Sequence, residues 1–402
     1  MPALTVEQAL ARIVAAATPI SDVQPRDLLG ATGHVLAAPL VARLTQPPFT
    51  ASAMDGYAVR AADVATLPAR LRVIGEAAAG RGFAGRLNAS EAVRIFTGAP
   101  VPEGADAIVI QENTVADGGH VTVRDGTPDA DHVRPRGGDF VAGDVLIAAD
   151  RRLTARDVVL AAAMGHAELP VRRPPLVAIL ATGDELVLPG ITPGPDQIVC
   201  SNTFGIAGMV RAAGGIPRLL GIARDTADSL GERLEAAKDA DILITVGGAS
   251  VGDHDLVGPV LKSRGMALDF WKIAMRPGKP LMYGRLGAQH VLGLPGNPVS
   301  SLVCTRLFVV PLVRALLGLV PEPAKPLQAR SAVALGANGP RTHYMRAIAH
   351  QGDDGDLMVT PVENQDSSLM RPLAAADCLL IRAIGARPEP AGARVNVLML
   401  DF

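Results

Sequence analysis

The loop at residues 247–253 places paired glycines, a serine, a third glycine and an aspartate after an apolar run, ILITV at residues 242–246. Such a run is typical of a buried parallel strand. Paired glycines after it would let backbone N–H groups converge on an anion, because no Cβ atom obstructs the approach. Asp253 and Asp255 would repel phosphate unless a divalent cation lay between the charges. The loop therefore favours an anionic ligand held together with Mg²⁺, with a tight strand-to-helix turn as the alternative.

Residues of similar types follow four further apolar runs between residues 176 and 300. These segments are 182–185 (TGDE), 224–225 (RD), 276–280 (RPGKP) and 295–300 (PGNPVS). A region built only for stability could use almost any turn sequence at these points. Because ligands bind at the carboxyl ends of the strands in a doubly wound sheet, we expect all five segments to form one site.

The side chains of these segments fall into three chemical groups. Hydroxyl groups and glycine amides suit a phosphate or a heterocycle, and lysine and arginine supply positive charge. Carboxylates are hard oxygen ligands that match Mg²⁺. The neutral donors are Thr182, Ser250 and Ser300, the cations are Lys272, Arg276 and Lys279, and the carboxylates are Glu185, Asp225, Asp253 and Asp255.

Structural roles are open for several of the same residues. Asp184 could cap a helix, and Asp225 or Asp228 could cap the helix that we expect near residue 227. The PGNP segment could be a rigid turn with proline at the first helical position. Lys272 could be a surface residue beside Trp271.

Three segments outside the strand ends also carry polar residues. MDGYA (54–58) could be an Asp-Gly hairpin turn, and TGAP (97–100) could be a simple turn. RTHYMR (341–346) is basic, with a solvated strand as the alternative. His254, between two aspartates, could bind a metal, but we favour a solvated histidine at a helix start.

The composition excludes several functional classes. The 402 residues include 38 Lys and Arg against 40 Asp and Glu, and this balance gives no electrostatic footprint for DNA or RNA. Three scattered cysteines without CxxC spacing fit reduced thiols rather than a zinc site. No apolar run approaches the roughly 18 residues of a spanning helix, and the N-terminus lacks a basic signal region. We expect a cytoplasmic protein without nucleic-acid or membrane partners.

Helical and β-type patterns alternate along the chain in four modules. Thr5 and Gln8 form a plausible capping box, whereas short β-like runs dominate from residue 47 to about 140 and residues 153–165 are again helical. Strands and helices alternate from residue 174, which is typical of a doubly wound, mostly parallel sheet. The predicted domains are a discontinuous helical domain (1–46 and 139–173), a β-rich insert (47–138), an α/β domain (174–324) and a small C-terminal β barrel (325–402).

Seven motifs of the chain occur in the order of a known family. Any one of them is weak, but the ordered set is specific. The motifs are MDGYA (54–58), TGAP (97–100), TGDEL (182–186), SN (201–202), GGASVGDHD (247–255), RPGKP (276–280) and PGNPVS (295–300). Over essentially its whole length the chain resembles the molybdopterin molybdenumtransferase family, the bacterial MoeA proteins, which are related to the E domains of gephyrin and its plant counterpart.

The resemblance implies the last step of molybdenum cofactor synthesis. With Mg²⁺ and molybdate, adenylylated molybdopterin would be cleaved at its phosphoanhydride, AMP would leave, and molybdenum would stay on the dithiolene. The resemblance also implies a MogA-like α/β domain and an elongated homodimer, with the site at the subunit interface and Asp55 and Thr97 supplied by the second subunit. The molybdopterin adenylyltransferase and recipient molybdoenzymes are further expected partners.

Residue chemistry and the resemblance together predict the site. The catalytic residues would be Asp55, Thr97, Glu185, Asp225, Asp255, Lys272, Arg276 and Lys279, with Glu185, Asp225 and Asp255 also binding the metal. Arg276 stands where some family members have lysine, and its planar fork would hold an oxyanion in a different geometry. The molybdopterin-binding residues would be Thr182, Gly183, Asp184, Ser201, Asn202, Gly247, Gly248, Ser250, Gly252, Asp253, Pro277, Gly278, Pro295, Gly296, Asn297, Pro298 and Ser300.

Two other functions are compatible with the same residues. A non-catalytic dimer could carry molybdopterin or act as a scaffold, although binding alone would not require four acidic residues. A pyrophosphate or nucleotide-sugar hydrolase of broad specificity would cleave ordinary dinucleotides without molybdate. The absence of an evident Ser, Cys or His nucleophile fits a reaction that depends on positioning and electrostatics.

Overall fold

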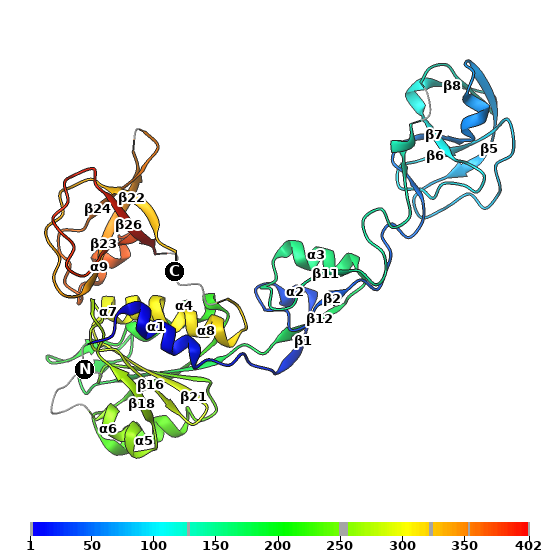
Figure 1. Cartoon of the computed structure of the whole chain (residues 1–402). Coiled ribbons are helices and arrows are strands. Elements are labelled where there is room, and N and C mark those ends of the chain that lie inside the picture. The colour runs from blue at the N-terminus through cyan, green and yellow to red at the C-terminus, as the bar shows by residue number, and fades with distance from the viewer. Residues whose placement is uncertain (1–2, 127–128, 249–255, 321–324, 353, 401–402) are drawn as a thin grey trace. The chain divides into compact units, whose positions relative to one another are not determined.

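The computed structural model describes residues 3–126, 129–248, 256–320, 325–352 and 354–400. Contacts divide the chain into two compact units, which Figure 1 colours by residue number. Unit 1 comprises residues 1–24, 33–35 and 172–402, and unit 2 comprises residues 25–32 and 36–171. Strand β1 (Val23–Asp27) pairs with β12 (Glu168–Arg172) where the chain passes between the units.

Unit 1 contains a six-stranded sheet with the strand order β16-β13-β17-β21-β20-β18. The first four strands of this order are parallel, and β20 runs antiparallel to both β21 and β18. Strand β18 therefore has the direction of the parallel strands, so five strands end at one edge, as the sequence predicts. The bounds are β13 (Leu176–Thr182), β16 (Ile216–Ala223), β17 (Ile242–Val246), β18 (Ala267–Trp271), β20 (Met282–Leu286) and β21 (Gln289–Leu294).

Helices cover both faces of this sheet (Figure 1). Ile179 packs in the core beneath one set of helices, and its neighbour Leu180 packs in the core beneath the other, because side chains alternate along a strand. The first set is α1 (Val6–Ala15), α4 (Asn202–Ala213), α7 (Pro298–Cys304) and α8 (Val310–Leu316), and the second is α5 (Ala227–Glu235) and α6 (Val257–Ser263). The π-helical segment η4 (Thr305–Val309) joins α7 to α8. The predicted doubly wound architecture is confirmed.

Short sequence signals set where these helices begin. The Thr5 hydroxyl accepts from the Gln8 amide at 3.2 Å and the Gln8 side chain accepts from the Thr5 amide at 3.0 Å, so the predicted capping box is confirmed. Helix α5 is capped by Thr226, whose hydroxyl accepts from the Ser229 amide. A capping role for Asp225 is therefore wrong.

The helix from Pro298 to Leu316 is long and apolar enough to cross a membrane by length and composition. In this structure, 83% of its most apolar window is buried inside the protein. A core helix passes the same test, and the residues of η4 and α8 pack here against the sheet and α1.

The C-terminal residues of unit 1 form a closed five-stranded barrel. Closure follows because β23 pairs with both β24 and β25. The strands are β22 (Leu327–Ser331), β23 (Thr342–Gln351), β24 (Leu357–Pro361), β25 (Cys378–Arg382) and β26 (Arg394–Met399), with helix α9 (Met370–Ala374) between β24 and β25. The short strand β19 (Met275–Arg276) extends this sheet by pairing with β23, and β14 (Leu186–Val187) pairs separately with β15 (Ile198–Val199). The predicted small barrel is confirmed.

Unit 2 is mainly β structure. Its six-stranded sheet has the order β7-β4-β6-β5-β9-β8. The strands are β4 (Gly56–Val59), β5 (Ala69–Ala77), β6 (Glu91–Ile95), β7 (Ala107–Ile110), β8 (Thr114–Asp117) and β9 (His120–Val123). The remaining elements are α2 (Leu28–Ala31), α3 (Ala155–Ala163), the pairs β2 (Leu40–Val41) with β11 (Val145–Ile147) and β3 (Ala51–Ser52) with β10 (Val133–Arg134), and the 3₁₀ segments η1 (Ala61–Val64), η2 (Gln111–Asn113) and η3 (Ala130–His132). The four predicted domain boundaries stay predictions; contacts place α1 in unit 1.

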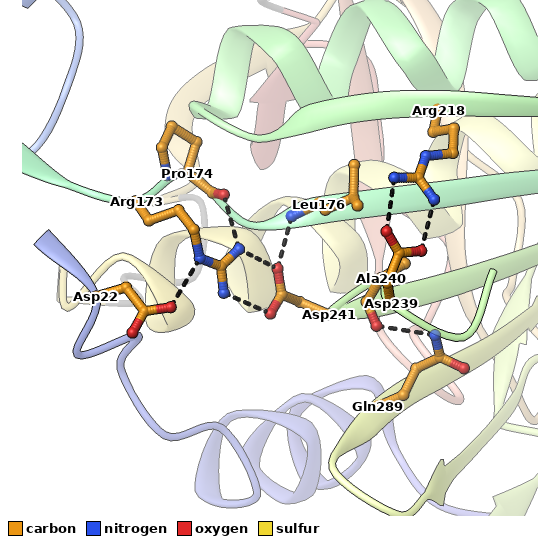
Figure 2. Close-up of polar contacts among 9 residues, drawn as sticks. All are labelled: Asp22, Arg173, Pro174, Leu176, Arg218, Asp239, Ala240, Asp241 and Gln289. Carbon is orange, nitrogen blue, oxygen red and sulfur yellow. Dashed lines mark hydrogen bonds and ion pairs between the residues drawn. The ribbon is translucent and has the colours of Figure 1, made fainter. Parts of the chain in front are cut away.

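The amino-terminal edge of the sheet in unit 1 carries paired charges (Figure 2). The Asp241 carboxylate accepts from both terminal nitrogens of Arg173, at 2.9 and 3.0 Å, and from the Leu176 amide at 2.7 Å. Arg173 also donates to Asp22 at 3.1 Å. The hydrogen bonds that Arg173 donates to Asp241 are the main cause of the raised pKa of Arg173. This network ties both chain segments that lead to unit 2 to the base of β17.

Candidate functional site

Two carboxylates follow neighbouring strands at the opposite, carboxyl edge. Thr182 pairs with Ala223 at the ends of β13 and β16, and Glu185 and Asp225 follow within three residues of that pair. Both side chains are exposed, and within the described residues neither carboxylate accepts a hydrogen bond or forms an ion pair. Their backbone is nevertheless held, because Asp184 accepts from the Asp225 amide at 3.3 Å. The structure therefore presents unpaired negative charge here.

This acidic end fits the predicted metal in ligand type. Unpaired, exposed carboxylate oxygens are the donors that Mg²⁺ prefers. Glu185 and Asp225 are two of the predicted ligands, and the third, Asp255, lies outside the described residues. Within the ranges that the structure describes, no group of three or more His, Cys, Asp or Glu side chains forms a complete metal site.

The end of β17 is built around a glycine. Gly247 has φ +95°, and a Cβ atom there would lie 2.6 Å from the carbonyl oxygen of Thr182, so a larger residue would not fit. The Thr182 hydroxyl is buried and directed at the Val246 carbonyl at 3.5 Å. Gly248 also has a positive φ. The predicted residues Ser250, Gly252 and Asp253, like His254, fall outside the described part of the chain.

The PGNP segment is the start of α7, as the structural alternative proposes. Pro298 is its first residue, and Asn297 occupies the capping position without a side-chain cap. The Asn297 side chain instead donates to the Ser367 hydroxyl at 2.9 Å, and the Val299 amide donates to the Ser367 carbonyl at 3.1 Å. The barrel therefore supplies partners to the first turn of α7.

The SN motif contacts the same segment. Asn202 is the first residue of α4, and its side-chain amide donates to the carbonyl oxygen of Gly296 at 2.7 Å. Ser201 is exposed just before it, and its hydroxyl lies 3.4 Å from the Asn202 side-chain oxygen. The strand end of β21 and the start of α4 are thus joined, as expected for one site.

A hollow of about 700 Å³ lies between the RPGKP loop, the start of α7 and the barrel. We call it the basic pocket, and it is lined by residues 276–280, Pro295, Asn297, Ser300, Arg341 and residues 363–367. Arg276 and Lys279 are exposed and form no hydrogen bond or ion pair with any described side chain. Gly278, with φ +103°, brings the loop so close to α7 that a Cβ atom would lie 2.6 Å from the Cys304 sulfur.

Positive charge at this pocket affects a neighbouring histidine. Strand pairing sets Arg276 beside His343. Burial, then the charges of Arg276 and Arg341, lower the pKa of His343 to about 4. On the barrel wall, hydrogen bonds from the Ser368 amide and hydroxyl lower the pKa of Asp366, so its charge is partly satisfied locally. The pocket thus offers unpaired cations to a bound anion.

Sequence reasoning missed the barrel's share of this pocket. Arg341 lines it, and the wall at residues 363–367 was not predicted at all. The RTHYMR segment was the available signal, but its alternative as a solvated strand is wrong at Arg346, which is only 1% exposed. Lys272 is not among the lining residues; its ammonium lies 4.7 Å from the centre of the Trp271 ring, as the surface alternative proposes.

Unit 2 brings two predicted residues together. The Asp55 carboxylate accepts from both the amide and the hydroxyl of Thr97, each at 2.8 Å. These bonds, chiefly the amide, lower the pKa of Asp55, and the nearby charge of Arg94 adds to the effect. The hairpin alternative is wrong, because β3 pairs with β10 and Gly56 begins β4 between β6 and β7.

Arg94 holds this turn in unit 2. Its guanidinium lies over the rings of Tyr57 and Phe96, at 5.1 and 4.8 Å from their centres. It also donates to the carbonyl oxygen of Gly56 at 2.9 Å. Asp55 is therefore an ionised carboxylate on a well-supported turn.

Family models match along the chain in the order expected. The MoeA N-terminal region (domains I and II) matches residues 4–165, the probable molybdopterin binding domain matches residues 178–315, and the MoeA C-terminal region (domain IV) matches residues 328–400. The match to the probable molybdopterin binding domain includes the carboxyl ends of all the strands that end at the carboxyl edge.

Individual relatives agree with these models. The molybdopterin molybdenumtransferase of Nostoc sp. is 37% identical over 391 residues, covering 95% of this chain and 89% of that protein. Molybdopterin molybdenumtransferase 2 of Mycobacterium tuberculosis is 40% identical over 336 residues, covering 80% and 82%. The crystal structure of the molybdopterin biosynthesis MoeA protein of Pyrococcus horikoshii has a TM-score of 0.86 at 28% identity and covers 100% of both chains. This chain therefore belongs to the molybdopterin molybdenumtransferase (MoeA) family.

Proposed function

We propose that the carboxyl edge of the sheet inserts molybdenum from molybdate into adenylylated molybdopterin and releases AMP. Transferase activity in molybdenum cofactor biosynthesis is the activity named for the relatives. The observation that carries the proposal is the division of one edge into two parts. Unpaired carboxylates follow β13 and β16, and unpaired cations line the basic pocket beside β21.

Charge compensation explains why such an edge suits this reaction. Molybdate and a phosphoanhydride are both anions, so their approach is opposed by Coulomb repulsion that is strong away from bulk water. Arg276 and Lys279, which form no ion pair with the described residues, lower that repulsion. The hydroxyl of Ser300, which lines the basic pocket, adds a neutral donor that orients an oxyanion.

Glu185 and Asp225 are the described residues that would hold Mg²⁺. Bound there, the ion would offset the charge of the pyrophosphate bridge and polarise its phosphorus. Until a cation compensates their negative charge, the two carboxylates repel the leaving phosphate and keep it away from this acidic end. Because neither carboxylate has a partner among the residues that the structure describes, their oxygen atoms are available to an ion.

We also propose a cytoplasmic homodimer in which Asp55 and Thr97 of a second subunit complete the cleft. The local structure around Asp55 supports this proposal, because two hydrogen bonds from Thr97 keep its carboxylate ionised and oriented. A carboxylate arranged in this way suits the recognition of a metal or of a substrate donor.

A single-turnover assay tests the chemistry. Purified protein would receive adenylylated molybdopterin and Mg²⁺, with and without molybdate, while AMP is followed over time. Molybdate-dependent release is expected, and Lys279→Met should slow it about 10- to 100-fold. Lys238→Met is the matched control, because Lys238 pairs with Glu235 on the surface at 2.5 Å. Tight binding without release would favour a carrier or scaffold, and rapid cleavage of ordinary dinucleotides without molybdate would favour a hydrolase.

Mixed dimers test the shared site. Asp55→Asn and Glu185→Gln should each abolish AMP release alone. If two subunits build each site, random mixing of the two inactive variants creates some sites with neither substitution. Activity should then return to roughly a quarter of the wild-type value. No recovery after verified subunit exchange would place Asp55 and Glu185 of one chain in the same site or remove Asp55 from it.

A further inference from the structure

Arg346 is a buried cation behind the basic pocket. It lies in β23 and is not among the residues that line the pocket. Its guanidinium forms no ion pair among the described residues and instead donates to the carbonyl oxygens of Asn364, Asp366 and Leu369, at 3.0, 2.9 and 2.9 Å. Because a buried charge is costly unless it is satisfied, these bonds bind the loop firmly to the strand.

Gln365 ties the same loop to the backbone of β23. Its side-chain oxygen accepts from the Arg346 amide at 3.0 Å, and its side-chain nitrogen donates to the carbonyl oxygens of Arg346 and Val362, each at 2.9 Å. Both the side chain and the main chain of residue 346 are therefore committed to residues 362–369.

The loop in turn holds the start of α7. The Ser367 carbonyl accepts from the Val299 amide, and the Ser367 hydroxyl accepts from Asn297. Amides in the first turn of a helix have no partner within that helix, so Ser367 supplies one that would otherwise be missing. Residues 363–367 also line the basic pocket together with Arg276 and Lys279. A chain of direct contacts thus runs from Arg346 through the loop to the pocket.

We propose that Arg346 is a positioning residue for the molybdate-type oxyanion in the basic pocket. It fixes the 364–369 loop so that Ser367 holds the start of α7 and the pocket keeps the shape that presents Arg276 and Lys279 to the anion. Arg346 itself does not touch the ligand. This inference rests on the proposed function of the basic pocket.

Arg346→Lys is the first test, since lysine keeps the charge but lacks the planar fork that reaches three acceptors. We expect the KM for molybdate to rise about tenfold while kcat changes by less than about threefold, the pattern of lost binding. Hydrogen exchange of the Val299 amide, measured by NMR in the absence of substrate, should be about tenfold faster than in the wild type. Gln365→Leu weakens the same loop without touching the buried charge, and both effects should appear at roughly threefold.

Arg330→Met is the matched control. Arg330 is an arginine of the same barrel, paired with Asp356 and absent from the lining of the basic pocket. It should leave KM, kcat and Val299 exchange at wild-type values. If Arg346→Lys does not fold, Val299 exchange in Gln365→Leu decides, because Gln365 itself lines the pocket and exchange without substrate does not depend on a direct ligand contact.

Two results would overturn the inference. One is an unchanged KM and unchanged Val299 exchange in the variants. The other is a fall in kcat alone, with faster exchange throughout β24 and β26, which would indicate a purely structural arginine. Failure of the proposed function has a different signature, because wild-type protein would then release no AMP while Val299 exchange still responded to the variants.

Discussion

The two edges of the sheet in unit 1 treat charge in opposite ways. At the amino-terminal edge, Asp241 has three donors and Arg173 has two carboxylate partners. At the carboxyl edge, Glu185 and Asp225 have no side-chain partners among the residues that the structure describes, and their backbone alone is fixed. The same strands connect both edges, so the difference does not come from the fold.

Each pattern has a physical consequence. A charge with good partners contributes to stability and is poorly available to a ligand, because a ligand must first replace those partners. An unpaired charge on a rigid backbone contributes little to stability and is ready for an anion or a cation. We infer that the amino-terminal edge holds the sheet together and that the carboxyl edge does the chemistry.

Replacing one carboxylate oxygen at the carboxyl edge should give the largest effect on activity. Asp225→Asn removes the charge and keeps the shape. We expect AMP release to fall by about 100-fold or more, because a proposed Mg²⁺ ligand and its charge are both lost. The thermal midpoint should change by no more than about 1 °C, since Asp225 has no side-chain partner among the described residues.

A single-turnover assay and thermal unfolding of the same preparation measure both quantities. Asp196→Asn is a matched control, as this exposed aspartate lies in the same unit outside the predicted site. A large loss of stability in Asp225→Asn would show that the carboxyl edge is also a structural edge.

The same substitution at the amino-terminal edge should have the reverse result. Asp241→Asn leaves Arg173 with Asp22 as its remaining carboxylate and weakens the bond to Leu176. We expect a loss of about 2–4 kcal/mol in the stability of unit 1, because a partly buried ion pair loses one partner. Native-state hydrogen exchange of the β13 and β17 amides measures that loss locally.

Activity per folded molecule should stay within about threefold of wild type in Asp241→Asn. A fall of 100-fold at a temperature where the sheet remains protected would contradict the separation of roles. The comparison is sharp because both variants make the same chemical change in the same sheet.

Local signals in the sequence were sufficient for much of this molecule. The cap at Thr5 and Gln8 involves residues three apart, and the buried strand ILITV is recognisable from its own composition. Placing five polar segments at one edge required only the rule that parallel strands end together. That rule held even though β20 is antiparallel, because β18 regains the common direction.

The missed parts depend on contacts between distant residues. The role of Arg346 exists only because β23 closes the barrel and meets residues 364–369, and nothing in RTHYMR shows that closure in advance. The amino-terminal network joins Asp22, Arg173 and Asp241, which are more than 60 residues apart in either direction. The capping alternative for Asp225 is wrong for a local reason: Thr226 is one residue closer to the helix and occupies the capping position.

A pH-dependent contribution to stability should come from His290 at the amino-terminal edge. Arg285 donates to its Nε2 at 2.9 Å, so Nδ1 carries the proton of the neutral ring and donates to the Tyr283 oxygen at 2.9 Å. Burial first, then Arg285, lower the pKa of His290 to about 4 from 6.5. Between these values the unfolded chain binds the proton and the folded chain does not, so stability falls as the pH falls from about 6.5 to 4.

The contribution of His290 to the slope of the free energy of unfolding against pH should reach at most about 1.4 kcal/mol per pH unit. Unfolding of wild type and of His290→Gln, measured at intervals between pH 7 and 4.5, tests this. The variant should be less stable at pH 7 and lose stability less steeply on acidification. Part of the slope should remain, because His343 also has a pKa lowered to about 4. Parallel curves would show that His290 does not titrate in this range.

The smallest effect should come from an ion pair that lies at the same edge but in solvent. Arg218 donates to Asp239 at 2.6 and 2.9 Å, yet the two side chains are 38% and 59% exposed. Arg218→Met should cost less than about 1 kcal/mol, because solvent screens an exposed pair. Native-state hydrogen exchange of the β16 amides measures this loss of stability. If Arg218→Met lost as much stability as Asp241→Asn, any ion pair at this edge would stabilise the sheet. A small loss would show instead that stabilisation depends on burial of the pair and is centred on Asp241.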